Sequence, residues 1–431
     1  MPARKEADSR RQRRLAARYA GLILALSVCG CPPKNGTGLR GGAKPVGGLE
    51  VRDIRVLLTS SGNRLRFQVS GPYEVRAAGA AGGASSTHAQ PTGWVAVAVE
   101  GGGLRVGRRR IGSGPVQIVP AGRAILELSF HRQGKWTPAA GYGGRLTLRV
   151  TSKGRLSAIN VVDLDTYIAG VLGRELYPDF HREAFRAQAV AARTYAMFEM
   201  ARHARRAYDV TATEASQVYG GLARGRAAAK AIEAAHHTRG IVATWSAPGG
   251  ERIFCTYYSS ACGGRSQDAA DCKPVASIPP LAGGVRCDYC RIAKGEAYRW
   301  KPVRLAKSTV QKRLFARYPQ VGTRLRSLAK VEVASRTHTG RPGKIRLVGT
   351  NNRTHELVAE DFRLAVGSRS MRSTDCRIQD QGEYILLTDG RGFGHGMGLC
   401  QWGMQGQALQ GRSAGQILKF YYPGMHLTRA Y

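Results

Sequence analysis

An alanine-rich segment, residues 183–198, is the sequence feature that most limits the folds open to this chain. It consists largely of strong helix formers. Five residues recur at spacings of three or four and therefore share one helix face. They are mostly small: Ala184, Ala187, Ala191, Thr194 and Phe198. Small side chains let a neighbouring element approach closely. We therefore predict a helix that packs tightly against another part of the fold.

The residues before this helix have the pattern of short strands. In residues 64–69 the apolar side chains alternate, which places Leu65, Phe67 and Val69 on one face. Similar runs at 51–58, 145–151 and 156–162 are separated by glycine-rich turns. After the alanine-rich helix we expect a second helix at 225–238, strands at 240–245 and 252–258, and a short helix at 413–421.

These patterns predict an α+β fold, because strands and helices do not alternate in a βαβ rhythm. The expected architecture is a mostly β N-terminal region followed by a mixed α/β catalytic-type core with a cleft. We place the β-rich part at residues 49–150 and the core at 151–431, with a cysteine-rich insert at 255–290.

The beginning of the chain has the features of an export signal. An arginine-rich stretch precedes the apolar residues 20–28, which are too few to span a bilayer. A lipobox-like sequence follows, with Cys31 as the acceptor of a lipid; cleavage near Gly30 without lipid is the alternative. We therefore expect a signal peptide at 1–31, a flexible tether at 32–48, and an exported lipoprotein of the cell envelope that contacts membrane only through its lipid anchor.

The formal net charge of +37 favours polyanionic partners such as anionic lipid, acidic glycans or nucleic acid. Arginines scattered over a solvated surface would give the same charge. The sequence contains no zinc finger of the nucleic-acid type and no RNP-like aromatic motif, and no long basic run follows the N-terminus. We therefore expect no nucleic acid among the partners.

Cys262, Cys272, Cys287 and Cys290 form a set that could hold a metal. Cys287 and Cys290 are a C-x-x-C pair, which is a natural metal chelate, and four thiolates suit a closed structural zinc site. Two disulfides are the competing interpretation for an exported protein. Seven cysteines remain after Cys29 and Cys31 are set aside, so at least one is not in an intramolecular disulfide. No cofactor for catalysis is expected.

Two further segments could carry chemistry. Glu175 lies among apolar neighbours that include Leu172, Leu176 and Tyr177, and burial there would raise its pKa toward that of a general acid. By spacing alone, an ordinary glutamate near a helix end is the more common case. The second segment, residues 390–403, has glycine at alternate positions around His395, so its backbone can approach a ligand or another chain segment closely.

Taken together, these segments resemble the stage II sporulation protein D family, which also contains amidase enhancers. The resemblance rests on five ordered motifs that cover roughly residues 50–428: a core motif at 167–175 and 183–195, then 216–220, 257–265, 392–403 and 417–424. It implies a lytic transglycosylase that acts on peptidoglycan glycan strands, preferably strands stripped of their stem peptides. A non-catalytic, glycan-binding amidase enhancer that activates a cell-wall hydrolase is the alternative.

The resemblance also implies residue roles. Glu175 matches the catalytic glutamate, and the positions that match motifs lining the cleft are Gln217, Tyr219, Tyr258, His395 and Gln401. Some members bind zinc near the segment around Cys262. Three departures concern the shape of the cleft: Cys400 stands where serine is usual, Tyr258 where histidine is usual, and the turn after Glu175 is longer. The expected partners are peptidoglycan strands and a cell-wall amidase.

Overall fold

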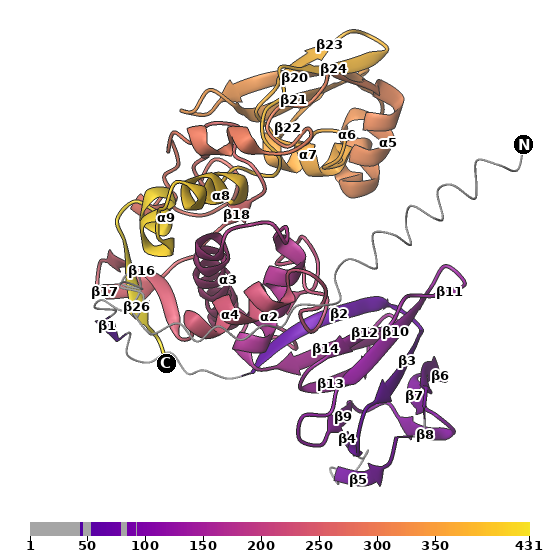
Figure 1. The fold of residues 1–431 in the computed structure, drawn as a ribbon. Coiled ribbons are helices and arrows are strands. Elements are labelled where there is room, and N and C mark those ends of the chain that lie inside the picture. The colour runs from indigo at the N-terminus through magenta and orange to yellow at the C-terminus, as the bar shows by residue number, and fades with distance from the viewer. Residues whose placement is uncertain (1–43, 46–52, 79–83, 92) are drawn as a thin grey trace, which may run out of the picture. The chain divides into compact units, whose positions relative to one another are not determined.

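The computed structural model describes residues 44–45, 53–78, 84–91 and 93–431, and its fold is α+β as predicted (Figure 1). The predicted signal peptide with Cys31 and nearly all of the predicted tether lie outside these residues. Among the residues that are described, no helix is both long enough and apolar enough to cross a membrane.

Two antiparallel-rich sheets make up the N-terminal part. The first sheet has the order β15 (Val210–Thr211), β2 (Ile54–Gly62), β14 (Leu156–Val162), β13 (Arg145–Val150), β9 (Val116–Pro120), β4 (Tyr73–Ala78) and β5 (Ala84–Ala89). The second has the order β11 (Lys135–Trp136), β10 (Leu126–Arg132), β3 (Arg64–Val69), β6 (Val95–Glu100), β7 (Gly103–Val106) and β8 (Arg109–Gly112), and β12 (Ala140–Tyr142) also pairs with β10.

The alternation read from residues 64–69 is confirmed by strand β3. Leu65, Phe67 and Val69 are buried, and the two residues between them are half-buried. Strand β14 begins and ends where the sequence predicts, and all seven of its residues are buried. It leads directly into the helices that carry the candidate site.

Three helices and one sheet form the next layer. The helices are α2 (Leu164–Glu175), α3 (Arg182–Arg202) and α4 (Ala228–His237), and the sheet has the order β1 (Lys44–Pro45), β26 (Met425–Arg429), β16 (Ile241–Ala247) and β17 (Gly250–Ile253). Helix α3 is the predicted alanine-rich helix. Ala184, Ala187 and Ala191 are fully buried, and α3 contacts α2, α4, α8, α9 and β16. The prediction of a tightly packed helix is thus confirmed.

The prediction of one continuous strand at 252–258 is wrong, because the strand is interrupted in its middle. Strand β17 ends at Ile253, residues 254–257 are irregular, and β18 (Tyr258–Ser259) pairs instead with β25 (Leu399–Cys400). Residues 401–409 form a helix, α8 (Gln401–Leu409), and only its first three residues belong to the glycine-rich segment 390–403 singled out from the sequence. It is followed by α9 (Ala414–Tyr421), which matches the predicted short helix, and the cysteine-rich insert contains two 3-10 turns, η1 (Pro279–Leu281) and η2 (Asp288–Ile292).

Residues 300–387 form a lobe with its own hydrophobic core, which the sequence did not separate from the rest of residues 151–431. Its elements are β19 (Val303–Ala306), α5 (Lys307–Arg317), α6 (Pro319–Leu325), β20 (Leu328–Arg336), β21 (Pro342–Gly349), β22 (Thr354–Val358), α7 (Ala359–Val366), β23 (Arg377–Asp380) and β24 (Tyr384–Thr388). They make two three-stranded sheets, ordered β19-β24-β23 and β20-β21-β22. We refer to residues 300–387 as the inserted lobe.

Candidate active site and metal centre

Glu175 is the last residue of α2, and its carboxylate is held by two elements distant in sequence. Helix α2 begins after Asp163, whose side chain accepts a hydrogen bond from the Thr166 N–H at 2.9 Å and so caps the helix. At the other end, the Val218 N–H donates to Oε1 of Glu175 at 3.0 Å, and Nε2 of Gln401 donates to Oε2 at 3.4 Å. The side chain is half-buried, so it is shielded yet still reachable from solvent.

Burial raises the pKa of Glu175 above its ordinary value, and the nearby charge of Glu214 acts in the same direction. The hydrogen bonds from Val218 and Gln401 favour the ionised form and partly offset the increase. The expectation that this carboxyl has a raised pKa is therefore met. Such a group can hold a proton at a pH where a surface glutamate has lost it.

Gln217, the chain neighbour of Val218, is joined to Tyr258 by a hydrogen bond. The hydroxyl of Tyr167 donates to Oε1 of Gln217 at 3.1 Å. Nε2 of Gln217 donates to the Tyr258 hydroxyl at 3.0 Å and to the Ala192 carbonyl at 3.3 Å. Gln217 is buried and Tyr258 is half-buried, and burial, together with the charge of Glu175, raises the pKa of Tyr258. This network fixes the orientation of Gln217 and Tyr258 next to the segment that holds Glu175.

Gln401 reaches the site because it is the first residue of α8, where only 7% of its surface is exposed. His395 lies in the preceding glycine-rich loop, and its ring is 6.0 Å from that of Tyr257. Its Nδ1 accepts a hydrogen bond from the Met397 N–H at 3.0 Å. Burial lowers the pKa of His395 to about 4, so the ring is neutral at neutral pH. It is half-buried.

Tyr219 and Tyr177 differ from what the sequence suggested. Tyr219 is 4% exposed, and its hydroxyl donates to Oδ1 of Asn160 at 2.9 Å, so it packs in the core and does not line a surface that a substrate could reach. Tyr177 was expected to help bury Glu175, but it is 55% exposed. Its ring lies 5.3 Å from that of Trp402 and 5.6 Å from that of Phe180. Tyr177 therefore offers an exposed aromatic surface two residues from Glu175.

The glycines of residues 390–403 are required by close packing, as their spacing predicted. Gly392 and Gly398 have positive φ angles of 81° and 59°. A Cβ atom at Gly398 would lie 2.3 Å from the Tyr257 carbonyl oxygen, and one at Gly390 would lie 2.1 Å from the Trp300 ring. The loop thus crosses other chain segments at distances that only glycine permits.

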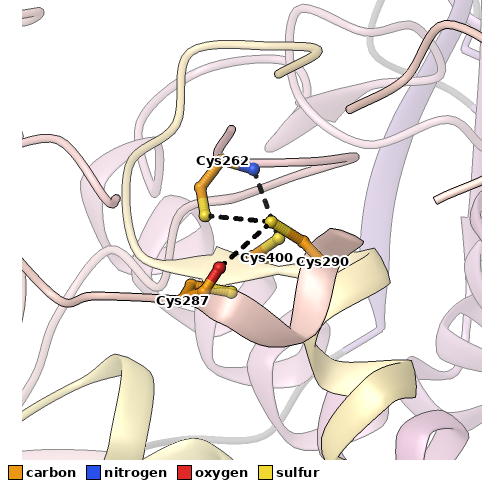
Figure 2. Close-up of side chains that lie close together, drawn as sticks. All are labelled: Cys262, Cys287, Cys290 and Cys400. Carbon is orange, nitrogen blue, oxygen red and sulfur yellow. Dashed lines mark hydrogen bonds between the residues drawn. The ribbon is translucent and has the colours of Figure 1, made fainter. Parts of the chain in front are cut away.

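Four buried cysteines converge beside this loop (Figure 2). They are Cys262, Cys287, Cys290 and Cys400, and their sulfur atoms all lie within 4.8 Å of one another. The set predicted from the sequence included Cys272 in place of Cys400, and this is corrected by the structure. The reason is that β25 pairs with β18 and so brings Cys400 next to Cys262, a contact between segments 138 residues apart that spacing could not reveal. Cys272 is buried elsewhere with a pKa raised to about 12.

The donor set fits a tetrahedral zinc ion. The Sγ atoms of Cys262 and Cys290 are 3.8 Å apart, and a tetrahedron with Zn–S bonds of about 2.3 Å has S–S edges of about 3.8 Å. All seven cysteines of the described residues are free thiols. Hydrogen bonds from Cys262, Cys290 and Cys400 lower the pKa of Cys287, which favours a thiolate in the cluster. The chemistry and spacing of the residues therefore suit a structural zinc site.

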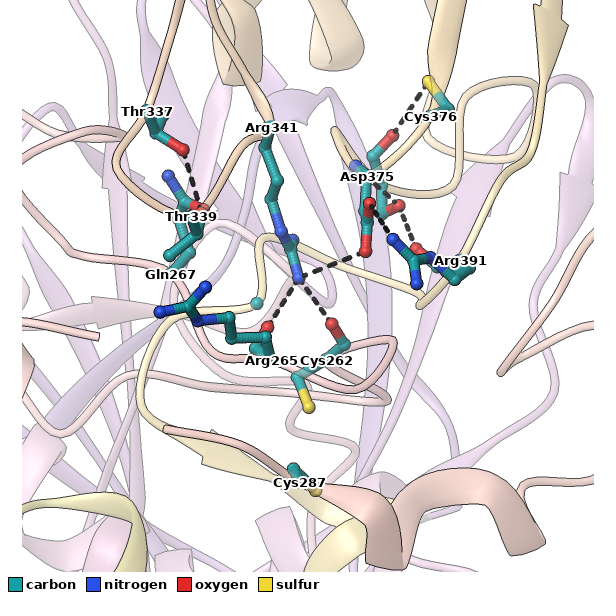
Figure 3. A network of polar contacts seen from close by, with 12 residues as sticks. Cys262, Arg265, Gln267, Cys287, Thr337, Thr339, Arg341, Asp375, Cys376 and Arg391 are labelled. Atoms are coloured by element: carbon teal, nitrogen blue, oxygen red, sulfur yellow. Dashed lines mark hydrogen bonds and ion pairs between the residues drawn. The ribbon is translucent and has the colours of Figure 1, made fainter. Parts of the chain in front are cut away.

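Arg341 connects the inserted lobe to this cluster (Figure 3). Its guanidinium is almost fully buried, and Nη2 donates to the carbonyls of Cys262 and Arg265 and lies 3.8 Å from Oδ2 of Asp375. A positive charge at this position attracts the negative charge of a thiolate cluster. The same residue also fixes the loop that carries Cys262.

Part of the candidate site lies in a segment of the chain that matches a family model. The family model described as stage II sporulation protein, SpoIID, matches residues 152–245, which include Glu175 and Gln217. An uncharacterised protein of Brachyspira hyodysenteriae is 32% identical over 271 residues, which cover 63% of this chain and 68% of that protein.

Two named relatives come from Bacillus subtilis. Stage II sporulation protein D is 26% identical over 288 residues, or 63% of this chain and 76% of the relative. An amidase enhancer is 26% identical over 302 residues, or 61% of this chain and 40% of the relative. The order of the motifs, the family match and these relatives agree, and the chain belongs to the stage II sporulation protein D family, which includes amidase enhancers.

Proposed function

We propose that this protein is a lytic transglycosylase that cleaves peptidoglycan glycan strands, in remodelling of the cell envelope during sporulation or division. The observation that carries the proposal is the environment of Glu175, a single half-buried carboxyl with a raised pKa that is positioned by Val218 and Gln401. The names of the relatives, stage II sporulation protein D and amidase enhancer, support a role connected with sporulation and the cell wall.

One carboxyl group is sufficient for this reaction. Protonated Glu175 gives its proton to the glycosidic oxygen as the bond from that oxygen to C1 of the muramic acid breaks, through an oxocarbenium-like state. The C6 hydroxyl of the same sugar attacks C1 and loses its proton to the Glu175 carboxylate. The products are a free 4-hydroxyl end and a 1,6-anhydro end. Glu175 is protonated again, and no water is consumed.

The neighbouring residues suit this cycle. Glu175 must be neutral at the start, ionised in the middle and neutral at the end. Burial favours its neutral form, while the hydrogen bonds from Val218 and Gln401 stabilise the carboxylate when it forms. The internal nucleophile makes the second step intramolecular, which is worth several kcal/mol when the geometry is right.

We also propose that Cys262, Cys287, Cys290 and Cys400 bind a structural zinc ion. Cys400 caps α8, because its Sγ accepts a hydrogen bond from the Gly403 N–H at 3.3 Å. The next residue is Gln401, which contacts Glu175. A metal at this position would hold the start of α8 and so the side chain that contacts the carboxylate. Zinc would supply a fixed anchor, and no reaction step involves it.

The wider setting follows from the same proposal. The protein acts outside the cytoplasm, held to a membrane by a lipid on Cys31. Its substrate is glycan from which an amidase has removed the stem peptides, so a cell-wall amidase is its functional partner. The net charge of +37 favours binding to an anionic polymer of this kind.

Digestion of purified peptide-free glycan strands, followed by mass analysis of the ends, tests the activity. Wild-type protein is expected to release 1,6-anhydromuramyl products, and Glu175→Gln to release none. Asp179→Asn is the matched control, because Asp179 is an exposed carboxylate four residues away. Reducing ends in place of anhydro ends would mean hydrolysis, and equal product from wild type and Glu175→Gln would refute the role of Glu175.

The amidase enhancer among the relatives supports one alternative, a non-catalytic protein that binds glycan and activates a hydrolase. In that case Glu175→Gln would retain stimulation of an added cell-wall amidase on intact peptidoglycan, and wild-type protein alone would leave the glycan uncut.

A further inference from the structure

A cavity of about 750 Å³ lies on the N-terminal sheet, away from the Glu175 network. The outer face of β2, β9, β13 and β14 forms one side, and residues 204–207 after α3 form the other. Helix α2 starts next to the end of β14, and Glu175 is at the opposite end of this helix, about 16 Å along its axis at about 1.5 Å per residue. None of the residues that line the cavity belongs to the candidate active site.

Five arginines line this cavity: Arg55, Arg145, Arg149, Arg205 and Arg206. Two of them are already paired. Arg55 contacts Asp209 at 2.6 Å, and Arg145 contacts Asp53 at 2.9 Å. Within the described part of the chain, Arg149, Arg205 and Arg206 have no carboxylate at ion-pair distance. Asp53 is the one acidic residue in the lining, so the cavity has an excess of positive charge.

The floor of the cavity is not a simple charged surface. Ile159 and Val161 are buried apolar residues of β14, and Thr147 and Gln117 stand beside them on β13 and β9. The register places Thr147 opposite both Ile159 and Gln117, which confirms that these side chains belong to one face of the sheet. An apolar floor with adjacent hydroxyl and amide groups, surrounded by guanidinium groups, matches a ligand that has both C–H surfaces and oxyanions. A cavity of this volume is in the range that holds ligands of disaccharide size.

We propose that this cavity binds a carboxylate-bearing sugar of the glycan strand, the muramic acid whose lactyl carboxyl is free once the stem peptide has been removed. The inference rests on the proposed function for the identity of the polymer, while the site itself rests on the cavity and its arginines. Arginine is suited to this ligand because its planar guanidinium can bind a carboxylate through two parallel hydrogen bonds. The cavity then forms a second point of attachment for the strand, separate from the site of cleavage.

A binding assay on the Glu175→Gln protein tests the proposal without turnover. Fluorescent peptide-free glycan strands are compared with the same strands after their carboxyl groups have been converted to methylamides. The double variant Arg149→Gln/Arg205→Gln, made in the same background, is expected to bind the free-carboxylate strands at least about tenfold more weakly, the loss of one or two charge-assisted hydrogen bonds. It is expected to bind the methylamide strands as the parent does.

Arg123→Gln is the matched control, because Arg123 is an exposed arginine of the same β-rich part that does not line the cavity. Two results would mean attraction by net charge alone and would overturn the proposal. One is a loss of affinity in Arg123→Gln equal to that in the double variant. The other is equal competition by inorganic polyphosphate and by unlabelled free-carboxylate strands. Equal binding of the two strand types to the parent would also overturn it. One outcome would separate the two proposals: the parent protein prefers free-carboxylate strands and the double arginine variant loses this preference, while wild-type protein releases no anhydro ends. In that case the cavity proposal stands and the catalytic proposal fails.

Discussion

Gly403 allows a sharp test of the packing between α8 and the cysteine cluster. It is the third residue of α8, and a Cβ atom there would lie 2.0 Å from the Tyr421 hydroxyl oxygen and 2.5 Å from Sγ of Cys287. Both neighbours are buried and enclosed, so neither can move aside without disturbing the core. The substitution Gly403→Ala should therefore displace Cys287 from the other three thiols.

The expected cost combines two opposing effects. Extra volume in a packed core destabilises by about 1–3 kcal/mol, and replacing glycine by alanine inside a helix contributes about 1 kcal/mol in the other direction. A clash of 2.0 Å with a rigid ring belongs at the upper end of the first range. We expect a net loss of about 1–2 kcal/mol in the free energy of unfolding, together with loss of zinc binding.

Gly173→Ala is the matched control. Gly173 also lies inside a helix, α2, but a Cβ atom there would be 3.6 Å from the nearest atom of Ala223, which is ordinary contact. This variant should be as stable as wild type or more stable, by up to about 1 kcal/mol. Urea unfolding followed by circular dichroism measures both variants, and metal analysis after dialysis gives the zinc content. Wild-type stability together with full zinc content in Gly403→Ala would refute the packing argument.

The remaining predictions concern the site. Because only protonated Glu175 donates a proton, the rate of glycan cleavage should fall as pH rises through the raised pKa of Glu175. Gln401→Leu removes a hydrogen bond that stabilises the carboxylate, so it should move this decline to higher pH in a pH–rate profile. An unmoved profile would count against the contact between Gln401 and Glu175. The pKa of Glu175 is raised in the folded state, so its ionised form destabilises the fold at neutral pH. Glu175→Gln should therefore raise the midpoint of thermal unfolding at pH 8, and should raise it less below about pH 4, where Glu175 is protonated in both states. An equal rise in the midpoint at the two pH values would exclude a titration effect. A chelator should lower the midpoint, and Zn²⁺ but not Mg²⁺ should restore it, whereas an unchanged midpoint would argue against a bound metal. Tyr177→Ala should raise KM for glycan strands about tenfold and leave kcat nearly unchanged, since contact with the aromatic ring contributes about 1–2 kcal/mol to binding. Tyr177→Phe, which keeps the ring, should behave like wild type. A decrease in kcat alone would exclude a binding role for Tyr177.

The sequence predicted well the features that depend on local pattern. The alanine spacing indicated α3, strict alternation indicated β3, and the apolar surroundings of Glu175 indicated a raised pKa, all of which the structure bears out. The repeated glycines of residues 390–403 indicated close backbone crossings, and Gly390 and Gly398 make them. In each case the signal lies within a few residues along the chain, although the partners that Gly390 and Gly398 approach, Trp300 and Tyr257, are distant in sequence.

The sequence failed where the cause is a long-range contact. Nothing near Cys400 indicates that β25 pairs with β18, so its thiol could not be assigned to the cluster in place of Cys272. Tyr219 follows Gln217 by two residues, yet its hydroxyl contacts Asn160 on β14 while Gln217 contacts Tyr258. The separate core of the inserted lobe depends on contacts among residues 300–387 and was likewise hidden.

The way the inserted lobe joins the rest of the chain has a consequence for its ancestry and for engineering. Arg299 and Arg391 form a β-bridge, and the Trp300 N–H donates to the Gly390 carbonyl at 3.0 Å, so the chain enters and leaves the lobe at neighbouring points. A segment with adjoining ends and its own core can be gained, lost or exchanged as a unit, with a short turn closing the gap. Its removal would take Arg341 with it and leave the Cys262 carbonyl without that guanidinium. A shortened relative therefore needs a different hydrogen-bond donor for the loop that carries Cys262.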